Sequence, residues 1–187
     1  MFRFAILAIA AVACSDDAAD TVDSGSPTTA DPSQVPPQGY AAIDAWIQDG
    51  VYEGWHCQAD VHPPSAISPH GPNRICSNDA ASGHGDGEYP VGAASVKELY
   101  DSTSTTIVGY AVATHVTAGT SGDTWYWYEQ VPPGTVITGL TIDANGVVAD
   151  GLGDSGQAMT LCVSCHAAAG ADATHPGHDM VYVQVSE

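Results

Sequence analysis

The sequence predicts an α+β protein built mainly from an antiparallel β-sheet with a few short helices. Two observations carry this prediction. Several runs rich in β-branched and aromatic residues are separated by Gly, Asp and Pro, as strands joined by turns are. By contrast, residues 40–55 (YAAIDAWIQDGVYEGW) have apolar positions that fit an amphipathic helix. A length of 187 residues favours one domain.

The first 38 residues are expected to precede the folded domain. Residues 1–13 combine Arg3 with an apolar run too short to span a bilayer, which is typical of an export signal. The ending AVAC resembles a bacterial lipoprotein signal, which would leave Cys14 as a lipid-bearing first residue; an ordinary signal peptide cut nearby is the alternative. Residues 14–38 are rich in Ser, Thr, Asp and Pro and predict a disordered tether. We therefore expect an exported protein of the periplasm or cell envelope, held at a membrane only by acyl chains.

The folded domain is expected to cover residues 39–187. It begins with the helix of residues 40–55, which we expect to break near Gly50, and continues through a loop at residues 58–72. Residues 143–146 (DANG) form a turn signal, and residues 157–168 are expected to be a short helix. Strands are predicted at residues 73–77, 91–100, 105–116, 124–129, 135–142 and 180–185.

Charge excludes several classes of partner. The chain has 22 Asp and Glu against 3 Lys and Arg, a formal charge of -19. Nucleic acids and anionic membrane surfaces need cationic side chains, so neither is an expected partner. A positively charged protein would suit this surface. Lys97 is the single lysine of the chain, and it lies in a predicted strand.

In a protein exported to an oxidising compartment, three of the five cysteines have roles that sequence motifs suggest. Cys14 is assigned to the lipid, and Cys162 and Cys165 belong to one motif. By elimination, Cys57 and Cys76 are expected to form a disulfide closing a loop of about 20 residues, a cross-link that stabilises by roughly 3 kcal/mol.

The motif CVSCH, residues 162–166, is the most specific signal in the chain. C-x-x-C-H is the attachment sequence of c-type haem. Cys162 and Cys165 lie one helical turn apart and would bind two vinyl groups of a porphyrin as thioethers, with His166 as the iron ligand. The alternatives are a zinc site completed by His175 and His178, a thioredoxin-like redox pair, or a plain disulfide.

Alternation along two predicted strands places small side chains on one face of each. Lys97 shares its face with Val91, Ala93, Ser95 and Leu99. His115 shares its face with Ile107, Gly109, Ala111 and Ala113. Since protein interiors are close-packed, such a face must be filled by something else, either a porphyrin or a packed helix.

These motifs resemble the cytochrome P-460 family, whose relatives include cytochrome c′-beta. The resemblance rests on the order and spacing of four segments: YPVGAASVKELYD (89–101), TWYWYE (124–129), CVSCH, and HDMVYVQV (178–185). HGPNRICSND (70–79) is similar to the preceding strand of that family. The resemblance implies an antiparallel-sheet haem protein, often a homodimer, with iron bound by the histidine of the attachment sequence.

The same resemblance implies roles for individual residues. In cytochrome P-460 a lysine is also linked covalently to the porphyrin, and Lys97 matches that position; the alternative is an ordinary surface lysine. The family's distal carboxylate has no match in residues 109–116, where His115 is instead a candidate base, a buried core histidine or an iron ligand. Tyr89 is a candidate for the distal wall. Arg74 is expected to pair with a haem propionate or a structural carboxylate.

Two functions follow from these expectations. The first is an exported haem oxidoreductase that oxidises hydroxylamine or handles nitric oxide at an open haem face and passes electrons to another cytochrome. The second is a non-catalytic cytochrome of the c′-beta type that binds gas or carries electrons. The remaining histidines are expected to be solvated loop residues: His56, His62, His70 and His84.

Overall fold

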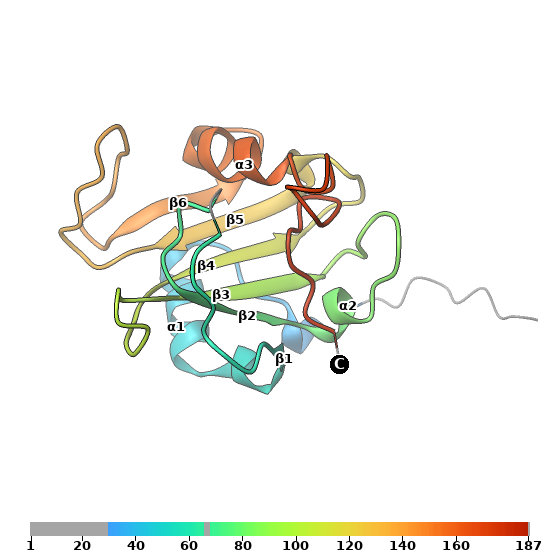
Figure 1. Cartoon of the computed structure of the whole chain (residues 1–187), viewed down its shortest axis with the longest axis horizontal. Coiled ribbons are helices and arrows are strands. Elements are labelled where there is room, and N and C mark those ends of the chain that lie inside the picture. Colours follow the sequence, from blue (N-terminus) through green and yellow to red (C-terminus); the bar gives the residue numbers. More distant parts are fainter. Residues whose placement is uncertain (1–29, 66–67, 187) are drawn as a thin grey trace, which may run out of the picture.

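A computed structural model describes residues 30–65 and 68–186, and within them the chain forms a six-stranded antiparallel sheet (Figure 1). The strand order is β1-β2-β3-β4-β5-β6, so every strand pairs with its neighbour in the sequence. The strands are β1 (His56–Cys57), β2 (Asn73–Ser77), β3 (Ala94–Tyr100), β4 (Ile107–His115), β5 (Trp125–Gln130) and β6 (Val147–Leu152). The predicted fold class, an antiparallel sheet with a few short helices, is confirmed.

The helices are short. Among the described residues they are η1 (Pro32–Gln34), α1 (Tyr40–Gln48), η2 (Val51–Gly54), α2 (Asp79–Ser82), η3 (Gly122–Thr124), η4 (Ala158–Val163, a π-helix) and α3 (Ser164–His166). The break expected near Gly50 is present, because Gly50 has a φ of 69°, a left-handed conformation that glycine adopts without strain. The helix expected at residues 157–168 is formed by η4 and α3.

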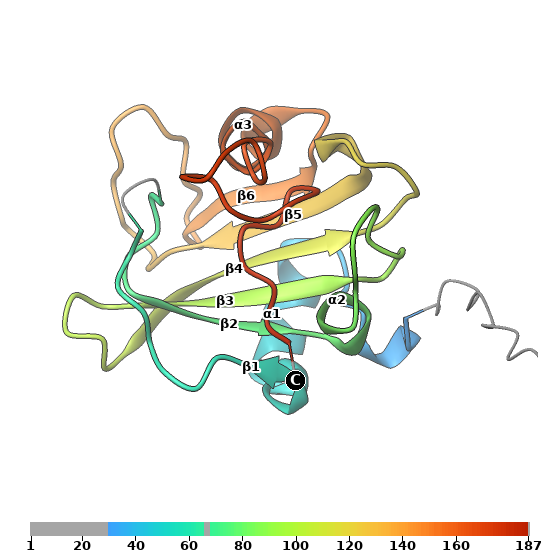
Figure 2. The same cartoon turned by 45° about the vertical axis from the view of Figure 1, so that its right-hand side comes forward.

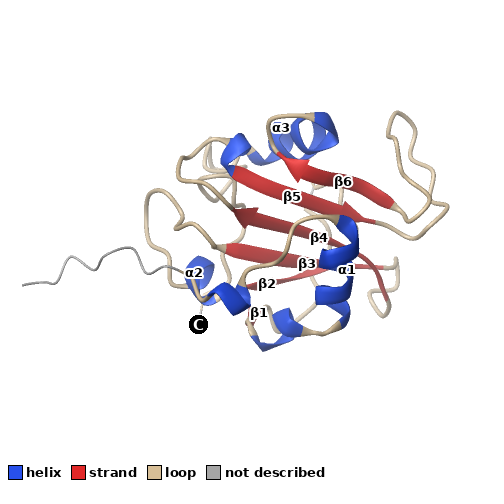
Figure 3. Cartoon of the chain, turned by 180° about the vertical axis from the view of Figure 1, so that it is seen from behind, coloured by secondary structure: helices blue, strands red, loops and turns tan. Residues whose placement is uncertain are grey.

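Helix α1 and η2 cover one face of the sheet (Figure 3). Alternate residues of the strands point to this face and pack against Ile43 and Ile47 of the helix. The buried sheet residues of this first core are Cys76, Ala94, Val96, Val112, Tyr126 and Tyr128. The apolar side of α1 and the alternate residues of the strands thus meet in one core.

The opposite face is covered by the C-terminal part of the chain, which runs from α3 across the strands (Figure 2). A second core lies here, around Trp125 and Trp127 of β5 and Tyr89 in the loop before β3. Ala158 of η4 and, partly buried, Met180 and Val181 close it. This layer contains CVSCH, which therefore lies on the face away from α1.

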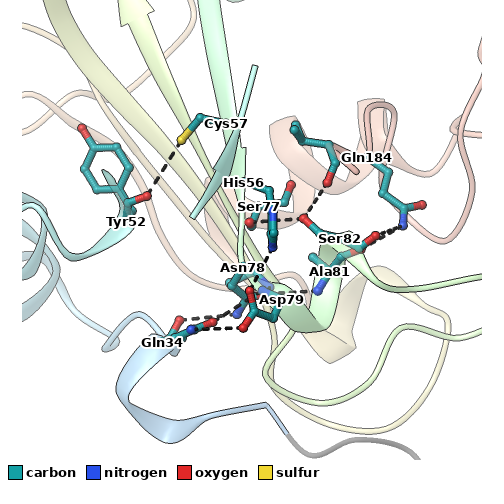
Figure 4. A network of polar contacts seen from close by, with 12 residues as sticks. Gln34, Tyr52, His56, Cys57, Ser77, Asn78, Asp79, Ala81, Ser82 and Gln184 are labelled. Carbon is teal, nitrogen blue, oxygen red and sulfur yellow. Dashed lines mark hydrogen bonds and ion pairs between the residues drawn. The ribbon is translucent and has the colours of Figure 1, made fainter. Parts of the chain in front are cut away.

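Polar contacts fasten the C-terminal segment to α2 (Figure 4). The Gln184 side-chain amide donates to the carbonyl oxygens of Ala81 and Ser82, each at 3.0 Å, and the Ser82 hydroxyl donates to the Val185 carbonyl. Asn78, which is fully buried, caps α2 by accepting from Ala81 N at 3.0 Å. These bonds fix where the chain crosses the sheet.

An ion pair with a buried carboxylate joins strands β2 and β3 on the α1 side of the sheet. Arg74 donates twice to the Glu98 carboxylate, at 2.7 and 2.8 Å, and the hydroxyls of Tyr52 and Tyr100 also donate to it. Burial would raise the pKa of Glu98, but the bonds from Arg74 and the two tyrosines outweigh it and lower that pKa. Of the two alternatives for Arg74, the structure therefore has the structural carboxylate.

Two predicted strands are wrong, and two observed strands, β1 and β6, were not predicted. Residues 135–142 form turns of a projecting loop, and residues 180–185 form no strand, with only an isolated bridge between His178 and Val181. Strand β6 was overlooked because VVADGL contains Asp and Gly. Asp150 nevertheless fits, since Tyr126 and the Tyr40 backbone N–H donate to it.

The N-terminal boundary of the domain also differs from the expectation. Residues 30–38, placed in the predicted tether, contact the folded domain: Ala30 is buried and the Gln34 amide donates to Asp79. The predicted export signal, residues 1–13, and the predicted lipid site, Cys14, lie outside the described residues. Within those described, there is no helix with the length and apolar character needed to cross a bilayer.

We predict that Glu98→Ala destabilises the fold by about 3 kcal/mol, because it leaves Arg74 and two tyrosine hydroxyls without their acceptor. Urea unfolding at neutral pH measures this, with Asp60→Asn, an exposed carboxylate, as the neutral control. Since folding lowers the pKa of Glu98, its stabilisation is present above the ordinary glutamate pKa of about 4.3 and is lost on acidification. The variant should therefore lose less stability than the native protein as the pH falls below 4.3; equal losses would contradict this role.

Candidate functional site

A cavity of about 680 Å³ lies on the sheet face opposite α1. This volume is in the range of small-molecule and cofactor sites. Three parts of the chain enclose it: the sheet, the loop after β1 with His62 and His70, and the C-terminal layer. The sheet residues that line it include Ile75, Ser95, Lys97, Ala111, Ala113, Trp127 and Glu129.

Small side chains at the centre of the sheet make room for the cavity. Ser95 pairs directly with Ala113, and Lys97 with Ala111, across strands β3 and β4. Because alternate strand residues share a face, all four point to the same side. The small-residue face predicted from the sequence therefore lines a cavity, not a helix interface.

The helix that carries CVSCH is seated on glycines. Its residue Val163 packs so closely against Gly122 and Gly153 that a Cβ atom on either would collide with it. The Tyr182 hydroxyl donates to the Cys165 carbonyl at 2.7 Å from the C-terminal side. This seat turns Cys162 and Cys165, both free thiols, toward the cavity.

The Cys162 thiol is not poised for thiol chemistry. Burial, with a smaller contribution from the Glu129 carboxylate, raises the pKa of Cys162 to about 12. A reactive cysteine of a redox pair has a lowered pKa instead. The environment of Cys162 thus differs from that of a thioredoxin-like site.

His166 is held in one orientation by the backbone. Its Nδ1 lies 2.6 Å from the Met180 carbonyl oxygen, which can only accept, so Nδ1 carries the proton and Nε2 keeps its lone pair. Burial lowers the pKa of His166 to about 4, which keeps the ring neutral. A neutral imidazole with Nδ1–H bonded to a carbonyl is the usual state of a metal-ligating histidine.

The turn that presents the Met180 carbonyl has unusual backbone geometry. Asp179 and Met180 both have positive φ, 44° and 68°, in the left-handed region that non-glycine residues rarely adopt. The Asp179 carboxylate accepts from the Tyr89 backbone N–H at 3.0 Å, and Met180 packs into the second core. Left-handed residues of this kind persist where surrounding contacts hold them, often at functional sites.

Lys97 lines the same cavity as the cysteines and His166. Its side chain is half-buried, and it forms no ion pair with the residues that the structure describes. Burial lowers the pKa of Lys97, with the Glu129 and Cys165 charges opposing this shift. The neutral, nucleophilic amine is therefore more accessible than in a surface lysine.

Glu129 and His70 are cavity residues that the sequence analysis missed. Glu129 Oε1 lies 3.5 Å from His70 Nδ1, and their side chains are 18% and 11% exposed. His70 is therefore not the solvated loop residue we expected. Alternation along the strand puts Glu129 on the same face as Trp127, and this was the sequence pattern that could have indicated it. Its place in the cavity depends in addition on the pairing of Glu129 with Ala111.

His115, the predicted base, lies elsewhere. It is fully buried, with Nε2 2.9 Å from the Gly119 carbonyl oxygen and its ring 4.9 Å from that of Trp125. It does not line the cavity, and neither does Tyr89, our candidate for the distal wall. Of the three alternatives for His115, this geometry is that of a core histidine.

The histidines of the zinc alternative do not join the cysteines. His175 Nδ1 is 2.9 Å from Asp172 in an exposed turn, and His178 stacks on Tyr89. Over residues 30–65 and 68–186, no three His, Cys, Asp or Glu side chains converge as metal ligands. In the other cysteine pair, Cys57 and Cys76 form a disulfide between β1 and β2.

Comparison of the chain with models of protein families, with curated proteins and with solved structures gave no match. The chain is therefore described by its fold, an antiparallel sheet whose strands pair in sequence order, and by the cavity on one face of that sheet. The family resemblance drawn from its motifs remains an expectation.

We predict that Gly153→Ala destabilises the protein by about 1–3 kcal/mol, the usual cost of overpacking a buried position. The added Cβ would collide with Val163 and the Gly122 carbonyl oxygen and push the cysteine-bearing helix off the sheet. The matched control is Gly85→Ala, whose Cβ would meet nothing within 4 Å. Urea unfolding of both variants checks this, and equal midpoints would show that the glycine seat is not needed.

Proposed function

We propose that this chain is an exported c-type haem protein resembling cytochrome P-460, which oxidises hydroxylamine or handles nitric oxide. One observation carries the proposal: a single cavity is lined by Cys162, Cys165, His166 and Lys97. These are the residues that the CVSCH motif and the family resemblance assign to haem. They come from two distant parts of the sequence, so their convergence does not follow from the motif itself.

The side chains around the cavity fit a haem. Cys162 and Cys165 would form the thioethers, and His166 Nε2, left unprotonated by the bond from Nδ1 to Met180, would be the iron ligand. The small and apolar sheet residues would lie against the porphyrin. Lys97 would be the residue that forms the additional cross-link in a P-460-like protein.

The cavity also supplies groups that could handle protons. The haem would provide the redox centre and the open position for a nitrogenous substrate. Glu129, 3.5 Å from His70, is a carboxylate within the same cavity, as the proton acceptor of hydroxylamine oxidation must be. We therefore assign the role of base to Glu129 in place of His115, with His70 holding its orientation.

The wider context is consistent with export. A disulfide between Cys57 and Cys76 suits an oxidising compartment. Lipidation at Cys14 and a partner cytochrome as electron acceptor complete the proposal. A possible homodimer belongs to the same family resemblance.

The first test is haem attachment. Expressed for export with a cytochrome c maturation system, the native chain should yield a haem peptide containing Cys162 and Cys165, and Cys162→Ala with Cys165→Ala should abolish attachment. Cys57→Ala with Cys76→Ala is the matched control and should retain haem. Mass spectrometry of the haem peptide also shows whether Lys97 is bound to the porphyrin. A bound Lys97 supports the enzymatic function, and an unmodified Lys97 favours the gas-binding or electron-carrying cytochrome. A colourless native protein would overturn the proposal.

The second test is the role of Glu129. Glu129→Gln keeps the shape of the side chain but removes the base, so hydroxylamine oxidation should slow by about 10²–10⁴-fold. Glu53→Gln, an exposed substitution on the α1 side of the sheet, is the control and should leave the rate unchanged. Steady-state assays with a one-electron acceptor measure both, with haem content determined first. An unaffected rate in Glu129→Gln would remove this residue from the mechanism.

A further inference from the structure

A continuous row of aromatic rings leads from His166 through the second core. The ring of His166 lies 4.7 Å from that of Trp127, between centroids. Trp127 lies 6.0 Å from Trp125, and Trp125 lies 5.7 Å from Tyr89 in an edge-to-face arrangement. Each of these spacings is that of rings in contact.

The row ends at two histidines near the surface. Tyr89 stacks on His178 at 5.1 Å with an interplanar angle of 12°, and its ring lies 4.2 Å from that of His84. Tyr89, Trp125 and Trp127 are at most 3% exposed, whereas both histidines are only half-buried. The row therefore connects the cavity wall with the exterior.

Packing alone does not require this arrangement. The first core also contains buried aromatic side chains, but they contact α1 and do not reach His166. In the second core the Trp125 indole N–H has no hydrogen-bond partner among the described residues, although a buried indole usually has one. Trp125 is thus placed by ring contacts to both neighbours in the row, not by a polar bond.

The surface around the end of the row is acidic. Asp86 and Glu88 are exposed in the loop between His84 and Tyr89. The two Lys and Arg side chains that the structure describes lie elsewhere, Arg74 on Glu98 and Lys97 in the cavity. A partner that docks here would be attracted if it were cationic.

We propose that these rings carry electrons from a haem held at His166 to a cationic one-electron redox protein docked at His84 and His178. The inference rests on the proposed haem. One electron leaves the haem, which is oxidised, and the acceptor is reduced by one electron; no bond or proton changes place. Electron tunnelling decays less steeply through packed aromatic rings than across gaps, so the row would define the exit.

The experiment places a photoactive ruthenium complex at the proposed exit and measures electron transfer to the haem by flash photolysis. Gly85→Cys provides the attachment point, because Gly85 is exposed next to His84 and a Cβ there meets nothing within 4 Å. In this labelled holoprotein, Trp125→Leu should slow the transfer several-fold. Trp125→Phe, which keeps a ring in the row, should largely preserve the rate.

Two controls separate the row from general effects on the protein. Trp55→Leu removes a buried ring from the first core, away from the cavity, and should leave the rate unchanged. A label at Gly54→Cys, exposed in η2 on the α1 side of the sheet, should report a rate that does not respond to Trp125→Leu.

The outcomes distinguish this inference from the proposed function. Haem content and the absorption spectrum are measured first, and absence of haem overturns both. With haem attached, an unchanged rate in Trp125→Leu, or equal slowing in Trp55→Leu, overturns the electron path and leaves the proposed function standing. Slowing confined to Trp125→Leu with the label at Gly85→Cys supports the path.

Discussion

The structure depends on the strict alternation of side chains across one sheet. Val96, Val112, Tyr126 and Tyr128 pack in the core beneath α1, while the alternate residues on the other face include Ser95, Ala111 and Ala113, which are too small to fill their side. Because protein interiors are close-packed, the covering segment must either pack directly onto these small residues or leave a space that a bound molecule fills. The C-terminal segment prevents collapse, because its bonds to α2 hold it across the sheet at a fixed place.

The alternation also separates two charged residues of β3. Glu98 and Lys97 are neighbours in the sequence but lie on opposite faces. Glu98 meets Arg74 and two tyrosine hydroxyls in a closed network, which stabilises the sheet. Lys97 meets no such partner among the described residues and projects into the cavity with a lowered pKa. One strand thus carries both a carboxylate that stabilises the sheet and an amine that lines the cavity.

Much of this arrangement could be predicted from the sequence, and the failures have physical causes. Local patterns sufficed for β2, for the break at Gly50 and for the face of Lys97. They failed at β6, whose Asp and Gly are tolerated only because of contacts to Tyr126 and Tyr40. The family resemblance placed the base in residues 109–116, which favoured His115 and left out Glu129 on the neighbouring strand. Only the position along the strand, fixed by pairing and by the C-terminal layer, puts Glu129 in the cavity and His115 in the core.

The order of the strands has a consequence for how the protein is assembled. Each strand pairs with the one just before it, so the sheet can form strand by strand from contacts between neighbouring segments of the chain, which favours fast folding. CVSCH follows the last strand, where Val163 rests on Gly122 and Gly153, and the segment beyond it adds the bond from Tyr182 to Cys165. The six strands can therefore be paired before that final segment crosses the sheet, so the cavity is closed only by the last part of the chain to be made.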